Sequence, residues 1–161
     1  MYAMHMRETS GSRGEKMQLI GRIIHALTQV HPTHPMFVHF PIALTGAAFL
    51  FALLAWWRNS ASLEQTAFAN IVLASISTVV AGITGYLDNI KNYVGEAPNH
   101  TAKIILAIIL FLLTAGISIV RYRTPDLFQK SNRFFYVASY GVCFAIALVL
   151  AFLGGVILYG F

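Results

Sequence analysis

Charged residues are scarce in this chain. Lys, Arg, Asp and Glu make up 11% of the 161 residues and 57% are hydrophobic, whereas an ordinary soluble domain is roughly 25% charged. This composition excludes the usual soluble globular class. No charged residue at all occurs in four long runs, which are residues 36–57, 66–87, 104–120 and 134–161. Each run reaches or approaches the ~20 residues that cross a bilayer core about 30 Å thick.

The runs also lack alternation between apolar and polar residues. A transmembrane β-barrel would show such alternation in strands of about ten residues, and helices and closed barrels are the structures that can satisfy their backbone hydrogen bonds in lipid. Short connections make each helix antiparallel to the one before it. The sequence therefore predicts an all-α integral membrane protein, with an antiparallel bundle of four transmembrane helices in residues 34–161.

Cysteine and catalytic motifs are equally scarce. The one cysteine, Cys143, lies inside the fourth apolar run, cannot form an internal disulfide, and is interpreted as a small buried apolar residue. The chain has no Gly-rich phosphate loop, no serine elbow and no HExxH pair. No secretory signal peptide is expected, because no apolar segment with a cleavage site precedes the first span. No catalytic constellation is apparent, so we expect at most an electron-transfer subunit of an enzyme.

Residues 1–33 form a separate N-terminal region. Between Lys16 and Val30, apolar residues recur at helical spacing, at Ile20, Ile23, Ile24 and Leu27. The pattern predicts an amphipathic helix lying in the membrane interface. A helix packed on the end of the bundle is the alternative.

Polar residues gather at one end of the predicted bundle. The first and third spans begin, and the second and fourth end, at the same membrane face, here called face A; the opposite face is face B. Topology brings to face A the residues His34, His39, Asp88, Glu96, His100 and Tyr159. Face B receives Trp56, Trp57, Glu64, Asp126 and the basic loop 121–133. Histidines at the start of a membrane helix are costly in lipid, which indicates a role for them.

His39 and His100 lie at or just inside the starts of the first and third helices, which are diagonal in a simple bundle. Imidazoles at equal depth on diagonal helices can hold haem iron from both sides. We therefore predict a haem b bound near face A by His39 and His100, with Phe40, Tyr86 and Tyr159 as candidate pocket walls. The predicted function is electron transfer, or membership of a membrane redox complex.

Two alternative interpretations of the same residues stay open. Neutral imidazole also binds zinc, copper or non-haem iron, so a transition-metal site could use His34, His39 and His100 with Asp88 or Glu96. The histidines could instead cap helix starts and bind interfacial water. The chain would then be a cofactor-free structural or assembly subunit, whose helices pack against partner helices through small residues.

Basic residues flank the apolar spans, so lipid headgroups rather than nucleic acid are the expected partner. Face B carries Arg58, Arg121, Arg123, Lys130 and Arg133, whereas the loop on face A has only Lys91 and Lys103. By the positive-inside rule, face B is cytoplasmic and the histidines face the periplasm. Four basic residues of the N-terminal tail oppose this count: Arg7, Arg13, Lys16 and Arg22.

The segment His34-Pro35-Met36-Phe37-Val38-His39-Phe40-Pro41-Ile42-Ala43-Leu44 resembles the opening signature of the domain of unknown function 2231 family, a group of small bacterial membrane proteins. The likeness continues with Thr84-Gly85-Tyr86-Leu87-Asp88, His100, Gly154-Gly155 and Tyr159-Gly160. It covers residues 34–161 and implies a four-helix protein of the inner membrane. Members of the family sometimes occur joined to cytochrome-like or other redox modules, which implies haem binding or electron transfer.

Overall fold

The computed structural model describes Glu15 and residues 17–22, 33–130 and 133–159, and these are helices and their connecting turns, with no strand among them. The chain divides into two compact units, Met1–Thr33 and His34–Phe161. In the first unit, Glu15 and residues 17–22 are helical, and Met17, Leu19 and Ile20 are exposed. The remainder of the predicted amphipathic helix, which is Lys16 and residues 23–30, lies outside the described residues, so its place in the membrane interface stays a prediction.

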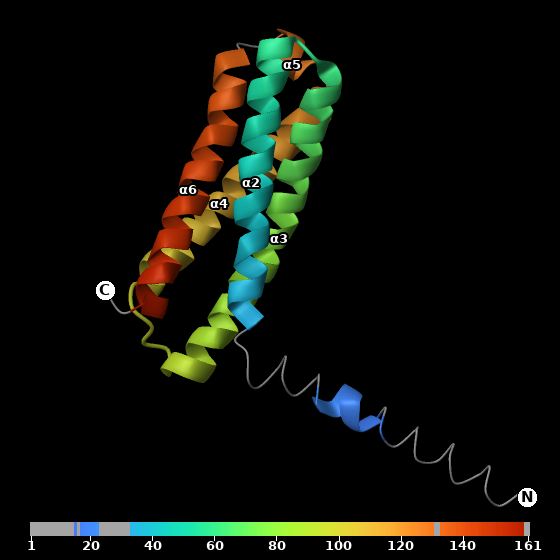
Figure 1. Ribbon diagram of the computed structural model, residues 1–161. Helices are drawn as coiled ribbons and strands as arrows, with labels where there is room; N and C mark the ends of the chain where they lie inside the picture. The colour runs from blue at the N-terminus through green and yellow to red at the C-terminus, as the bar shows by residue number, and fades with distance from the viewer. Residues whose placement is uncertain (1–14, 16, 23–32, 131–132, 160–161) are drawn as a thin grey trace, which may run out of the picture. The chain divides into compact units, whose positions relative to one another are not determined.

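The second unit consists of four long helices: α2 (Thr33–Arg58), α3 (Ala61–Tyr93), α4 (His100–Arg123) and α6 (Arg133–Tyr159). A short helix, α5 (Leu127–Lys130), precedes α6. Figure 1 shows the long helices running antiparallel along one another, with α5 at the end where α2 turns into α3. All four are long and apolar enough to cross a membrane. The prediction of an antiparallel bundle of four transmembrane helices is confirmed.

Small residues form the buried face of α2. Pro41, Thr45, Ala48, Ala52 and Ala55 are buried and follow one another at steps of four and three residues, the spacing of a single helix face. Small side chains let neighbouring helices approach closely, and this packing takes the place of a hydrophobic driving force between helices in lipid. This stripe therefore determines which side of α2 faces the bundle and which side faces lipid.

Gly46 allows α2 and α6 to pack closely. A Cβ atom added to Gly46 would lie 2.9 Å from Cε2 of Phe144, a side chain of α6. Real Cβ contacts are essentially never that short. Gly46 therefore makes room for the Phe144 ring, which also stacks with Phe49 at a centroid distance of 6.3 Å.

Helix α3 is longer than the sequence predicted. The polar residues that follow the second apolar run predict a loop over residues 88–100. This prediction is wrong at its start, because α3 continues to Tyr93. Its 33 residues extend about 50 Å, well beyond a bilayer core of about 30 Å. The polar residues after Leu87 continue the helix outside the core, where Asn92 Nδ2 donates to Asp88 Oδ1 at 2.6 Å. The helix ends where Val94 and Gly95 take positive φ angles, a common helix stop.

Prolines sit inside the start of α2. Pro35 lies in the first turn of α2, whereas Pro41 lies two turns in, inside the helix. Because proline has no N–H, Pro41 cannot donate to the carbonyl of Phe37. The hydroxyl of Thr45 donates to the carbonyl of Pro41 at 2.6 Å.

Candidate functional site

His39 projects from the outer side of α2. It comes two residues before the buried Pro41, a rotation of about 200° around the helix, so it lies opposite the buried stripe of α2, and its side chain is exposed. Its Nδ1 atom makes a hydrogen bond with the carbonyl oxygen of Pro35, one turn earlier. Since a carbonyl oxygen only accepts, Nδ1 is the donor in this contact, and Nε2 is the ring nitrogen without a part in it.

His100 begins α4 and is half-buried. Its Nδ1 lies 3.2 Å from the carbonyl oxygen of Ala97, and its Nε2 lies 3.2 Å from the hydroxyl of Thr101. Both ring nitrogens therefore have partners within their own helix start and the preceding loop. Ala97, which is buried, is itself held by Asn89, whose Oδ1 accepts from the Ala97 N–H at 3.0 Å.

His34 is in the first turn of α2, and its side chain packs directly on Gly85 of α3. A Cβ atom on Gly85 would lie 2.7 Å from Cε1 of the imidazole, so only glycine leaves room for the ring. The ring's Nδ1 is 3.4 Å from the hydroxyl of Thr84. The charges of Asp88 on α3 and Lys103 on α4 act on the same imidazole. His34 therefore packs on α3 at face A, within the range of a charge on α4.

The remaining residues predicted for this site are Phe40, Tyr86 and Tyr159. Phe40 and Tyr86 are each 58% exposed. Tyr159 ends α6, and its side chain lies outside the described residues. Among the residues that the structure describes, no group of three or more His, Cys, Asp and Glu side chains could hold a metal ion.

A second polar cluster lies at face B, inside the bundle. Glu64, in the first turn of α3, is only 2% exposed. Both carboxylate oxygens accept from Arg121 near the end of α4: Nε donates to Oε1 at 2.6 Å and Nη2 to Oε2 at 2.7 Å. This is a bidentate ion pair, the geometry in which arginine binds a carboxylate most strongly.

Two tyrosines of α6 complete the cluster. The hydroxyl of Tyr136 donates to Glu64 Oε1 at 2.5 Å and lies 2.8 Å from the hydroxyl of Tyr140. Both tyrosines are buried. No buried side-chain nitrogen or oxygen among the described residues lacks a hydrogen-bond partner. The cluster therefore links α3, α4 and α6 without leaving an unsatisfied polar group in the bundle.

Sequence reasoning missed this cluster. Glu64 and Arg121 each lie just outside an apolar run, where a charged side chain is normally solvated. To predict that these two residues pair, one must know how α3, α4 and α6 are rotated about their axes in the bundle. The sequence could have predicted that Glu64 is buried, because its helical spacing with Ala67, Ile71 and Ala74 puts the carboxylate on the buried face of α3.

Four apolar helices around a packed interior with satisfied polar groups define a multi-pass integral membrane protein, as far as the described residues extend. The chain belongs to the family described as predicted membrane protein (DUF2231), whose model matches residues 30–161. No curated protein and no solved structure matches the chain.

Proposed function

We propose that this protein is a subunit of a membrane redox complex and that His39 would hold the iron of a haem b where the bundle meets another subunit. The observation that carries the proposal is the orientation of His39. Its imidazole is exposed, and the hydrogen bond to the carbonyl of Pro35 leaves Nε2 as the free nitrogen. A histidine whose other nitrogen is tied to a carbonyl is the usual form of a ligand that is oriented in advance for iron.

The surroundings of His39 fit a porphyrin. Met36 and Ala43 share its helix face, at three residues before and four after, and Phe40 lies beside it. All three are exposed, so a flat apolar group could lie against them. When bound, haem supplies one-electron transfer; His39 would hold its iron, and the apolar neighbours would exclude water from it.

The burial pattern favours the outside of the bundle over its interior. A haem between α2 and α4 would require His39 to point inward, yet His39 lies opposite the buried stripe of α2. His100 is half-buried and has partners for both ring nitrogens. We therefore infer that a second residue holding the iron would come from another chain. The haem bound by both His39 and His100, as predicted from the sequence, stays a prediction. Variants of the two histidines can distinguish it from a haem held by His39 alone in this chain.

The proposed orientation in the membrane follows from the distribution of basic residues between the two faces. Face B holds most of the basic residues of the loops, so by the positive-inside rule the His39 end lies on the periplasmic side of a bacterial inner membrane. An electron carrier there would exchange electrons with partners at the outer surface of that membrane.

A reduced-minus-oxidised absorption spectrum tests this proposal. The protein is extracted in mild detergent with its native partners and compared with the same chain purified alone. Sharp reduced α and β bands in the assembled sample, weaker in the isolated chain, are expected. An assembled sample with no Soret band would contradict the proposal.

A cofactor-free structural subunit is the second candidate. It is supported by open glycines on the helix surfaces: a Cβ added to Gly82 on α3 or Gly116 on α4 would meet nothing within 4 Å. Such positions allow a helix of another subunit to approach closely. This candidate predicts that His39→Ala leaves both complex assembly and electron transfer intact, whereas the haem proposal predicts that electron transfer is lost.

A further inference from the structure

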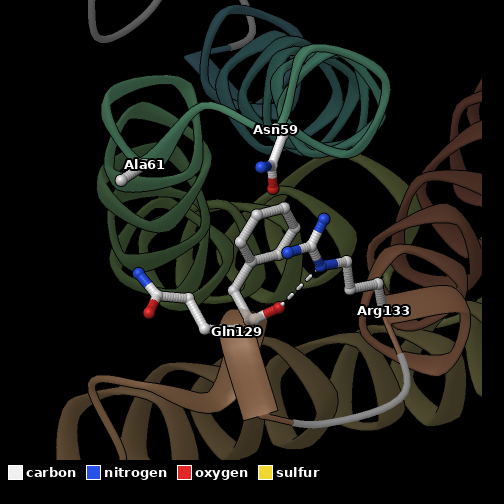
Figure 2. Close-up of a pocket in the computed structure, with 5 residues that line it drawn as sticks. Asn59, Ala61, Gln129 and Arg133 are labelled. Atoms are coloured by element: carbon white, nitrogen blue, oxygen red, sulfur yellow. Dashed lines mark hydrogen bonds between the residues drawn. The ribbon is translucent and has the colours of Figure 1, made fainter.

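A cavity lined by hydrogen-bond donors lies at face B, at the opposite end of the bundle from the histidines. Its volume is about 320 Å³, and it is lined by Asn59 and Ala61 at the α2–α3 turn, Phe128 and Gln129 of α5, and Arg133 at the start of α6. Small-ligand sites begin at roughly 300 Å³. Figure 2 shows Asn59 and Arg133 pointing toward one another across this space. We propose that this cavity binds the phosphate group of an anionic ligand.

Arg133 is held in place for such a ligand. Its guanidinium lies 5.0 Å over the ring of Phe128, and its Nε donates to the Phe128 carbonyl at 3.2 Å. Phe128 is buried, and its ring packs against that of Tyr136 at a centroid distance of 5.7 Å, so the platform under the guanidinium is fixed. These contacts use one of the five N–H donors of arginine. The donors on the two Nη atoms take no part in this hydrogen bond and can form the fork that binds phosphate.

Two amide side chains add neutral donors around the same space. Asn59 and Gln129 line it from different segments, and each amide carries two N–H donors. Gln129 is exposed, so a ligand can reach it from outside the bundle. No lining residue is acidic. An anion in the cavity would thus meet one guanidinium and two amides, with no carboxylate in the cavity wall to repel it.

The acidic residue in the first turn of α3 is already neutralised. This residue is Glu64, whose charge would otherwise repel an anion near Ala61. It is bound by Arg121 through both carboxylate oxygens. The positive end of the α3 dipole therefore remains available and adds to the attraction.

The cavity lies close to the tryptophans that mark the membrane depth of the phospholipid headgroups. Trp56 and Trp57 precede the cavity residues by only a few positions, and Trp57 is 80% exposed. Exposed tryptophans mark the depth of the lipid headgroups. The phosphate could belong to an anionic phospholipid or to a free phosphate ion, and both present the same oxygens to Arg133.

A binding titration in detergent micelles tests the proposal with three probes: phosphatidylglycerol, phosphatidylcholine and inorganic phosphate. Two variants alter the cavity, Arg133→Gln and Gln129→Glu. The second keeps the Arg133 contacts and replaces an exposed side chain, so it tests the cavity without disturbing the bundle. The matched control is Arg123→Gln, which changes the net charge by the same amount as either variant but at an exposed residue outside the cavity.

We expect both cavity variants to weaken phosphate-group binding by about tenfold or more, because a hydrogen-bonded charge is lost or opposed. The control should change it by less than about twofold, since exposed charges act weakly. Preference for phosphatidylglycerol identifies a lipid, and equal competition by inorganic phosphate identifies a free ion. Equal weakening in all three variants, or no binding of any probe, would overturn the proposal. None of these outcomes depends on haem at His39.

Discussion

Glu64 and Arg121 form a bidentate ion pair inside the bundle, with both nitrogen–oxygen distances at or below 2.7 Å. The residues are 57 positions apart in the chain and belong to α3 and α4. Tyr136 brings α6 into the same contact. Removing a buried pair from water is expensive, so the pair is retained only where its hydrogen bonds are complete. The result is a link among three helices at the face B end.

Neutralising the carboxylate should destabilise the bundle. Glu64→Gln leaves the half-buried Arg121 without a counter-charge, and the loss for a fully buried pair, about 3–5 kcal/mol, is the upper bound. The measurement is the free energy of unfolding in detergent by titration with denaturing surfactant. Glu96→Gln is the control, because Glu96 is exposed in the loop between α3 and α4. Equal stability of the two variants would show that the Glu64 pair contributes nothing.

The tyrosine contact should contribute less than the ion pair. Tyr136→Phe removes one hydrogen bond to a charged group, worth about 1.5–3 kcal/mol, together with the contact to the Tyr140 hydroxyl, while the ring stays in place. Tyr122→Phe is the control, because Tyr122 is 79% exposed. The same unfolding titration measures both variants. A Tyr136→Phe protein as stable as the Tyr122→Phe protein would mean that the hydroxyl is dispensable.

Close packing between α2 and α6 makes Gly46 sensitive to a single methyl group. Gly46→Ala places a Cβ atom 2.9 Å from the Phe144 ring, and overpacking of this kind costs about 1–3 kcal/mol. Gly82→Ala is the control, because nothing lies within 4 Å of that position. It should be neutral, or stabilising by up to about 1 kcal/mol, through helix propensity. A lower melting temperature for Gly82→Ala than for Gly46→Ala would contradict the packing.

Membrane orientation can be mapped with cysteines, since the chain's one cysteine is buried. In a Cys143→Ala background, Glu96→Cys reports on face A and Thr124→Cys on face B, both at exposed positions. With face B cytoplasmic, an impermeant maleimide should label the Glu96→Cys variant in intact spheroplasts. It should label the Thr124→Cys variant only after the membrane is disrupted. The reverse pattern would place His39 on the cytoplasmic side.

The four spans could be predicted because a charge-free apolar run of bilayer length is stable chiefly as a helix in lipid. The end of α3 could not, since a helix that leaves the bilayer core can continue through polar residues such as Asp88 and Asn92, and the stop at Gly95 is a local backbone feature. The direction of His39 could have been inferred from the small residues of α2. The stripe through Thr45 and Ala48 marks the packed side, and His39 lies opposite it.

The contact between Glu64 and Arg121 is a different case. Each residue taken alone is an ordinary interfacial charge, and their meeting depends on how three helices are rotated. Sequence periodicity could assign Glu64 to the buried face of α3, but it could not identify which cation on which helix reaches it. Such pairings are a property of the packed bundle rather than of any one segment.

The most direct test of the proposed function compares the Soret band of the native assembly in His39→Ala and His100→Ala variants, each purified with its partners at equal protein concentration. Because His39 faces outward and His100 has partners for both nitrogens, we expect His39→Ala to lose the band and its reduced α peak. His100→Ala should retain both. Loss in both variants would place the haem between α2 and α4, and a band unchanged by His39→Ala would contradict the role of His39 altogether.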